Sequence, residues 1–82
     1  MYTIIISDAA RKQLHKLEKH TAQRIIAALE RCRVRPHRHV QRLVDSPHYR
    51  LRIGDYRAIL RLEDDTLVIL VITITHRKRA YQ

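Results

Sequence analysis

Hydrophobic positions change their spacing along the chain, and the changes predict its helices and strands. Residues 2–6 are rich in β-branched side chains and predict a short first strand. Apolar residues then recur at helical spacing in two runs, for which Ser7 and Thr21 are candidate caps. The short join between the runs predicts an antiparallel helical hairpin. The two runs are Ala9, Ala10, Leu14 and Leu17, and then Ala22, Ile25, Ile26, Leu29 and Cys32.

The second half of the chain predicts strands. Residues 33–47 are basic and interrupted by prolines, so we expect a surface connection with one short strand near 40–44. Apolar and polar positions then alternate in three expected strands, joined by two-residue turns at Gly54-Asp55 and Asp64-Asp65. The expected fold is one α+β domain over residues 1–82: an N-terminal strand and a two-helix antiparallel hairpin packed on one face of a three- to four-stranded, mostly antiparallel sheet. The three expected strands cover residues 48–53, 56–63 and 66–75.

The Gly54-Asp55 turn predicts the register of its hairpin. If those two residues form the loop, Arg52 faces Arg57 across the strands. Because opposed residues share a face and side chains alternate, one face is apolar and the other basic. The apolar face collects Tyr49, Leu51, Ile53, Tyr56, Ala58 and Leu60. The basic face collects His48, Arg50, Arg52, Arg57 and Arg61.

The basic face indicates a ligand. Like charges placed opposite each other destabilise a sheet, so we expect this cluster, with no acid in it, to be kept for a ligand. The alternative is four arginines that extend into water while their stems cover apolar surface. Carrying the register through Asp64-Asp65 adds an apolar stripe, which indicates either a partner site or a strand covered by the protein's own loops. The stripe is Val68, Leu70, Ile72 and Ile74.

Charge favours a polyanionic partner. The 82 residues carry 17 Lys and Arg against 8 Asp and Glu, a net charge of +9, and arginine can grip phosphate with two parallel bonds. A solvated basic surface or an acidic protein partner would have the same balance. The single Cys32 favours a reducing cytoplasm. With no long apolar run and no basic leader before Asp8, neither a membrane span nor a signal peptide is expected.

The six histidines do not predict a metal site. His37 and His39 lie two apart, and His15 and His20 lie five apart, so neither pair has a recognised ligand spacing with Cys32 or a carboxylate. Cys32 ends a helical stripe and is expected in the core. No metal and no other cofactor is expected.

Two sequence motifs resemble the RelE-type toxins of the RelE/ParE superfamily. The first is the run Tyr-Arg-Leu-Arg-Ile-Gly-Asp-Tyr-Arg at residues 49–57, followed by Ala-Ile-Leu. The second is His76-Arg77-Lys78 with Tyr81 four residues after the arginine. Arg42-Leu43 before Ser46-Pro47 also fits the segment that leads into the first motif. The resemblance extends over essentially the whole chain.

The resemblance implies the toxin of a toxin–antitoxin pair. Such a toxin enters the ribosomal A site and cuts messenger RNA without a metal: the RNA 2′-hydroxyl attacks the adjacent phosphate and leaves a 2′,3′-cyclic phosphate. The implied partners are the ribosome, mRNA and an acidic RelB-like antitoxin, which forms a hetero-oligomer with the toxin. We expect weak cleavage of free RNA, because no carboxylate is expected on the basic face.

The candidate site residues follow from the motifs. The resemblance assigns catalytic roles to Arg52, Arg57, Arg77 and Tyr81. Fixed guanidinium groups stabilise charge that develops on phosphate oxygens. We expect this role for Arg57 and phosphate gripping by Arg50 and Arg52, whose roles are not separable. The resemblance places Arg77 at the leaving group and Tyr81 against a base. The remaining RNA-binding candidates are Arg50, Arg61, His76, Lys78 and Arg79.

The general base stays open at this point. Arginine remains protonated near neutral pH and is a poor base. His76 has an imidazole suited to proton transfer, and Tyr81 would lose its proton more readily beside cations.

Two other functions fit the same sequence. A ParE-like toxin would inhibit DNA gyrase on the same fold without cleaving anything, although such toxins typically lack the basic, tyrosine-bearing tail. A plain nucleic-acid-binding module would contact phosphate through the basic face without chemistry.

Overall fold

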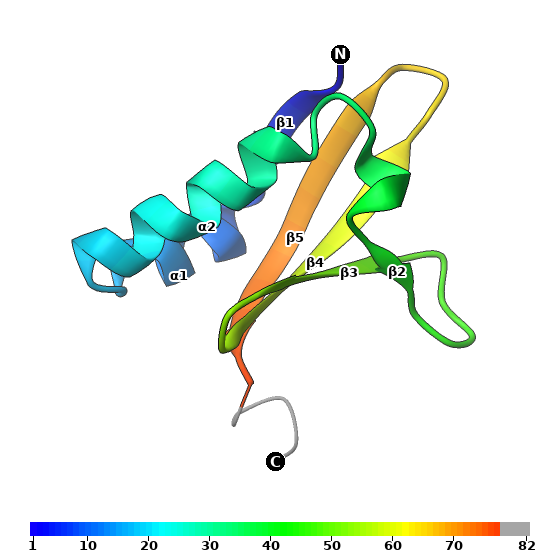
Figure 1. Ribbon diagram of the computed structural model, residues 1–82. Coiled ribbons are helices and arrows are strands. Elements are labelled where there is room, and N and C mark those ends of the chain that lie inside the picture. The colour runs from blue at the N-terminus through cyan, green and yellow to red at the C-terminus, as the bar shows by residue number, and fades with distance from the viewer. Residues whose placement is uncertain (78–82) are drawn as a thin grey trace.

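A five-stranded sheet carries two helices on one of its faces (Figure 1). The structure is a computed structural model and describes residues 1–77. In chain order its elements are β1 (Thr3–Ile6), α1 (Asp8–His15), α2 (Lys19–Arg31), the 3-10 helix η1 (Pro36–Arg38), β2 (Gln41–Arg42), β3 (Tyr49–Ile53), β4 (Tyr56–Glu63) and β5 (Val68–His76). The predicted α+β fold, with its helices packed on the sheet, is confirmed.

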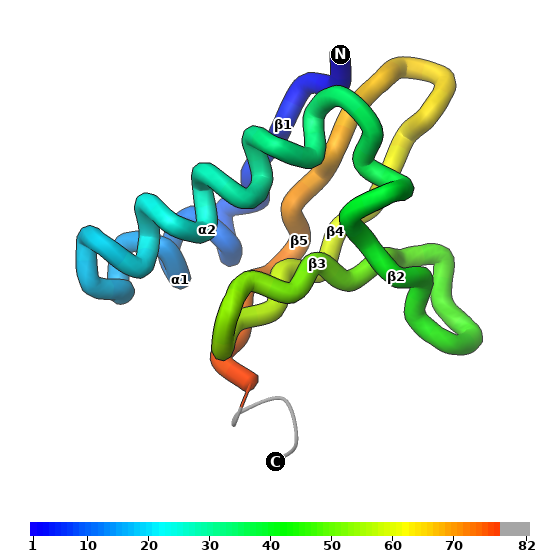
Figure 2. The backbone as a smooth tube through the Cα atoms, in the orientation of Figure 1, coloured from blue at the N-terminus to red at the C-terminus, as the bar shows by residue number. Residues whose placement is uncertain are grey.

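The strand order is β1-β5-β4-β3-β2, and every neighbouring pair is antiparallel except β1 and β5. The described residues thus form five strands, where three to four were predicted. The difference arises at both edges: β1 lies parallel to β5, and the two-residue β2 pairs with β3. Figure 2 shows the β3–β4 hairpin turning back beside the end of β5, where the Arg77 N–H donates to the Asp55 carbonyl at 2.6 Å.

Side chains of α1 and its cap close the edge of β5 that the short β1 leaves open. Ser7 caps α1 as predicted, because its hydroxyl oxygen accepts from the Ala10 N–H at 3.1 Å, and it also donates to the Ile72 carbonyl at 2.6 Å. Further along α1, the Gln13 Oε1 accepts from the Ile74 N–H at 2.6 Å, and its Nε2 donates to the Thr73 hydroxyl at 2.9 Å. Gln13 therefore takes the place of a strand neighbour.

The second helix begins earlier than predicted. Glu18 is its N-cap, without a side-chain capping bond, and the Ala22 N–H donates to the Glu18 carbonyl at 3.0 Å. The prediction of a Thr21 cap was wrong, because nothing between Lys19 and Thr21 breaks a helix and the first turn can form before the threonine.

The buried apolar residues form one core between the helices and one face of the sheet. Cys32 lies in it, fully buried, and burial raises the pKa of its thiol, with Arg31 acting in the opposite direction. A thiol in that state packs as a small apolar side chain, as the sequence predicted. The buried members are Ala10, Leu14, Ile25, Ala28, Leu29, Cys32, Leu51, Ile53, Ala58, Leu60, Ile69, Val71 and Ile74.

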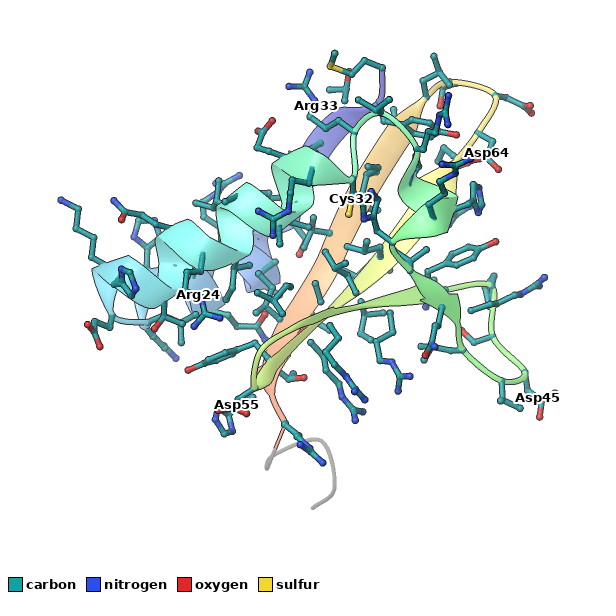
Figure 3. The ribbon with its side chains drawn as sticks, viewed as in Figure 1. Arg24, Cys32, Arg33, Asp45, Asp55 and Asp64 are labelled. Atoms are coloured by element: carbon teal, nitrogen blue, oxygen red, sulfur yellow. The ribbon has the colours of Figure 1, made fainter. Side chains whose placement is uncertain are left out.

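The loop between β4 and β5 has four residues, not the two that were predicted. It runs from Asp64 to Leu67, and Leu67 has a left-handed φ of 55°. The Asp64 carboxylate accepts from the Tyr2 hydroxyl at 2.7 Å and lies 3.1 Å from the His37 Nε2 (Figure 3). These two hydrogen bonds, that of Tyr2 first, hold the pKa of Asp64 below its ordinary value and join the loop to the N-terminus and η1.

Candidate nucleic-acid interface on the sheet

The β3–β4 hairpin has the register that the sequence predicted. Arg52 pairs with Arg57, Leu51 with Ala58, and Arg50 with Ile59. The loop is Gly54-Asp55, with Gly54 at a left-handed φ of 56° that glycine adopts without strain. Because opposed residues share a face, the guanidinium groups lie on one side of the sheet, and the buried residues that alternate with them, such as Leu51 and Ala58, lie on the other.

We call this surface the arginine face and define it as Arg50, Arg52, Arg57 and Arg61. The helices α1 and α2 lie against the other side of the sheet (Figure 1), so neither of them covers these side chains. Arg52 and Arg61 are exposed, while Arg50 and Arg57 are half-buried. Guanidinium groups held at this spacing can grip a phosphodiester and stabilise negative charge that develops on it.

A carboxylate lies on the arginine face, contrary to the prediction. Glu63 follows Arg61 by two residues on β4, and Arg61 Nε lies 2.6 Å from its Oε1. Arg61 is therefore paired with Glu63 in the free protein, and because this carboxylate is held by Arg61 we still expect weak cleavage of free RNA. This position of Glu63 could have been predicted from the sequence, because residues two apart on a strand share a face.

The predicted apolar stripe is only half present, and a β-bulge explains why. The two extra loop residues preserve the alternation, so Val68 and Leu70 still lie on the arginine face, opposite Glu63 and Arg61. Between Ile59 and Leu60 the register shifts by one, which leaves Ile72 as the extra residue and reverses the faces beyond it. Ile74 consequently lies in the core, 4% exposed.

The end of β5 separates two candidate residues of the tail motif. His76 pairs with Tyr56, and their rings meet edge to face with centroids 5.0 Å apart. By strand alternation, Tyr56 and His76 belong to the face of the sheet that contains the buried Ala58 and Ile74, so His76 does not lie on the arginine face. Arg77 is exposed, and its N–H bond to Asp55 extends the ladder by one position, towards the side of Arg57. The candidates Lys78, Arg79 and Tyr81 lie outside the described residues.

The edge of the sheet at β2 adds a hollow to the arginine face that the sequence analysis did not identify. His39, Gln41, Arg50 and Arg52 line it, and the Arg50 Nη2 donates to the Gln41 Oε1 at 2.5 Å. A short strand near residues 40–44 was expected, but without its pairing with β3 neither His39 nor Gln41 could be assigned to a face.

The tip of the hairpin brings helix arginines close to the arginine face. The Arg24 Nη2 lies 3.2 Å from the position that a Cβ on Gly54 would occupy (Figure 3). Arg24, Arg31 and Arg52 line a common hollow beside this turn. Sequence reasoning missed the two helix arginines, because helical periodicity places them on an exposed side without showing which strand lies beside it.

Within residues 1–77, no group of three or more His, Cys, Asp and Glu side chains could hold a metal ion. None of the helices in the same range is both long and apolar enough to cross a membrane.

Comparison with known families identifies the class of protein. The model of the family described as the ParE toxin of type II toxin–antitoxin systems, parDE, matches residues 4–81. The chain belongs to this family, which confirms the predicted membership of the RelE/ParE superfamily. It is thus a toxin of a toxin–antitoxin system.

Solved structures of RelE systems have a similar fold. A chain of the RelBE2 toxin–antitoxin complex from Mycobacterium tuberculosis is 25% identical, with a TM-score of 0.82 over 93% of this chain and 98% of that one. A chain of the archaeal RelE–RelB complex from Pyrococcus horikoshii OT3 is 26% identical, with a TM-score of 0.82 over 95% and 97%. The isolated E. coli RelE toxin, 19% identical with a TM-score of 0.76 over 93% and 84%, shows the likeness of fold alone. None of the curated proteins matches the chain.

Proposed function

We propose that this toxin is a ribosome-dependent endoribonuclease that cleaves messenger RNA in the A site. One observation carries the proposal: Arg50, Arg52 and Arg57 lie together on a sheet face that the helices leave uncovered. Three guanidinium groups on one face can hold the phosphate of an RNA chain and can also stabilise the negative charge that develops on its oxygens during cleavage. The likeness to the fold of RelE supports the same class of substrate.

In the proposed reaction the RNA 2′-hydroxyl attacks the adjacent phosphate and leaves a 2′,3′-cyclic phosphate, without a metal. Arg57 stabilises charge on the non-bridging oxygens, and Arg50 and Arg52 hold the phosphate. Arg77, at the end of the ladder beside Asp55, stabilises the leaving 5′-oxygen. Tyr81 orients the nucleotide by stacking, and Lys78 and Arg79 bind RNA.

Two RNA-binding candidates have smaller roles in this proposal than the sequence indicated. Arg61 contributes little unless RNA displaces Glu63 from it. His76 contacts Tyr56 on the face of the sheet that faces the core. It would therefore contact RNA only at the end of β5, beside the tip of the β3–β4 hairpin.

The proposed partner is an acidic, RelB-like antitoxin that covers the arginine face in a hetero-oligomer. Relatives of similar fold are found in RelE–RelB complexes. Opposite charge would direct the encounter. We place the pair in the cytoplasm and treat residues 1–82 as one toxin domain.

The family match supports a second candidate function. Because that family is described as the ParE toxin of parDE systems, inhibition of DNA gyrase without cleavage is the competing proposal. A binding module without chemistry is the third.

Induced expression separates the three functions. If the toxin is a nuclease, growth stops while messages are cut inside codons, and the single variant Arg57→Ala relieves both effects. Growth arrest with intact messages and an SOS response would instead establish the gyrase inhibitor. Absence of arrest would leave only the binding module.

A further inference from the structure

A hollow at the β2 edge of the sheet shows where His39 lies. Gln41 pairs with Arg50, and His39 is the C-cap of η1, two residues before Gln41. Val40, between them, packs against the core. His39, Gln41, Arg50 and Arg52 line one common hollow. His39 therefore belongs to the arginine face.

The other histidines are engaged by other residues or lie farther from Arg52. His37 contacts the Asp64 carboxylate at 3.1 Å, and His76 contacts the Tyr56 ring. His15 and His20 are exposed on the helices. His48, just before β3, continues the alternation of Arg50 and Arg52, but at the end of the hairpin away from Arg52.

Cleavage by a 2′-hydroxyl requires a proton acceptor, and arginine cannot serve as one. Imidazole is the side chain that gains and loses a proton near neutral pH. We propose that His39 is this acceptor, positioned at the end of η1 in the hollow that it shares with the phosphate-gripping Arg50 and Arg52. The inference rests on the proposed nuclease function and adds a catalytic residue to it.

The proposed step conserves atoms and charge. The 2′-hydroxyl proton moves to an unprotonated ring nitrogen of His39 as the 2′-oxygen forms its bond to phosphorus. The bond from phosphorus to the 5′-oxygen breaks, and that oxygen keeps the electron pair and takes a proton from solvent. His39 is exposed and can return its proton to water. The phosphodiester also brings negative charge, which offsets the repulsion between an imidazolium and the guanidinium groups of Arg50 and Arg52.

Single-turnover cleavage of ribosome-bound mRNA across a range of pH tests the proposal. In the wild type, the rate should rise about tenfold per pH unit below the histidine range and then level off. His39→Gln should cleave about 10²- to 10⁴-fold more slowly and lose that limb. His39→Phe keeps a ring for stacking but accepts no proton, and should be equally slow. Added imidazole should partly restore His39→Ala.

The controls separate proton transfer from other effects. His20→Gln, on the exposed surface of α2, should keep the wild-type rate and profile. Ribosome affinity and thermal melting should be the same for His39→Gln as for the wild type. Cleavage by His39→Gln or His39→Phe at the wild-type rate would overturn the proposal, as would loss of the pH limb in His48→Gln instead. If the wild type itself fails to cleave ribosome-bound mRNA, the nuclease function fails and His39 has no such role.

Discussion

Arg52 and Arg57 face each other directly across the β3–β4 ladder, on the side of the sheet opposite to α1 and α2. Directly opposed like charges weaken a strand pair. The hairpin keeps its register because the apolar pair of Leu51 and Ala58, next along the ladder, is buried in the core. We expect this placement of two guanidinium groups to favour binding of an anion at some cost to the stability of the fold.

Removal of one charge from this pair should stabilise the free protein. We expect Arg52→Gln to raise the free energy of unfolding by about 0.2–1 kcal/mol, and the gain should shrink at high salt because ions screen the repulsion. Urea denaturation at low and high salt measures both effects. Arg38→Gln, at an exposed position at the end of η1, lowers the net charge equally and should change little. Equal gains in the two variants would show that net charge alone is responsible.

The ion pair of Arg61 and Glu63 should limit how much Arg61 contributes to RNA binding. We expect Glu63→Gln to tighten binding of a single-stranded oligoribonucleotide and to steepen its dependence on salt, by about 0.7 in logarithmic slope for one new phosphate contact. Arg61→Gln should weaken binding less than Arg52→Gln does. Fluorescence anisotropy over a salt series measures the three variants. A loss of RNA affinity in Arg61→Gln as large as that in Arg52→Gln would contradict the limited contribution expected of Arg61.

The contacts of Asp64 should make stability depend on pH. Its pKa is lowered in the folded protein, so its contribution is present above the ordinary value of 3.8 and is lost as pH falls through the folded value. Melting temperatures of the wild type should therefore fall more steeply below pH 4 than those of Asp64→Asn. Asp65→Asn, one residue along the same loop, is the matched control and should follow the wild type. If the melting temperatures of all three proteins fall in parallel below pH 4, the contacts of Asp64 are not the cause of the pH dependence.

Gln13 should matter more for stability than other helix-surface glutamines. Gln13→Ala leaves the part-buried Ile74 N–H without an acceptor and removes the bonds to Thr73, at a cost of about 1–2 kcal/mol. Gln23→Ala, exposed on α2, should cost far less. Denaturant titration compares the pair, and similar losses would mean that Gln13 does not act as a strand neighbour.

The hairpin and its basic face could be predicted from the sequence because the geometry there is local. A two-residue loop at Gly54-Asp55 allows one register, and alternation then assigns every side chain between Tyr49 and Leu60 to a face. Glu63 and Arg61 could have been paired by the same reasoning.

Other features depend on contacts between distant segments, which local patterns do not encode. The bulge at Ile72 reverses the faces of the last part of β5, and no residue type there marks it. The loop that was predicted to close at two aspartates extends to Leu67, which has a left-handed φ. The placement of His39 needs the pairing of β2, and that of Arg24 needs the packing of α2 against the hairpin tip.

The most direct test is cleavage by purified toxin of the same mRNA, either free or positioned in the ribosomal A site. We predict cuts within the A-site codon on ribosomes, a product ending in a 2′,3′-cyclic phosphate, and little cleavage of the free message. Arg57→Ala should remove the cuts. An intact A-site codon in the presence of active wild-type toxin would contradict the account, and so would equally fast cleavage of free RNA.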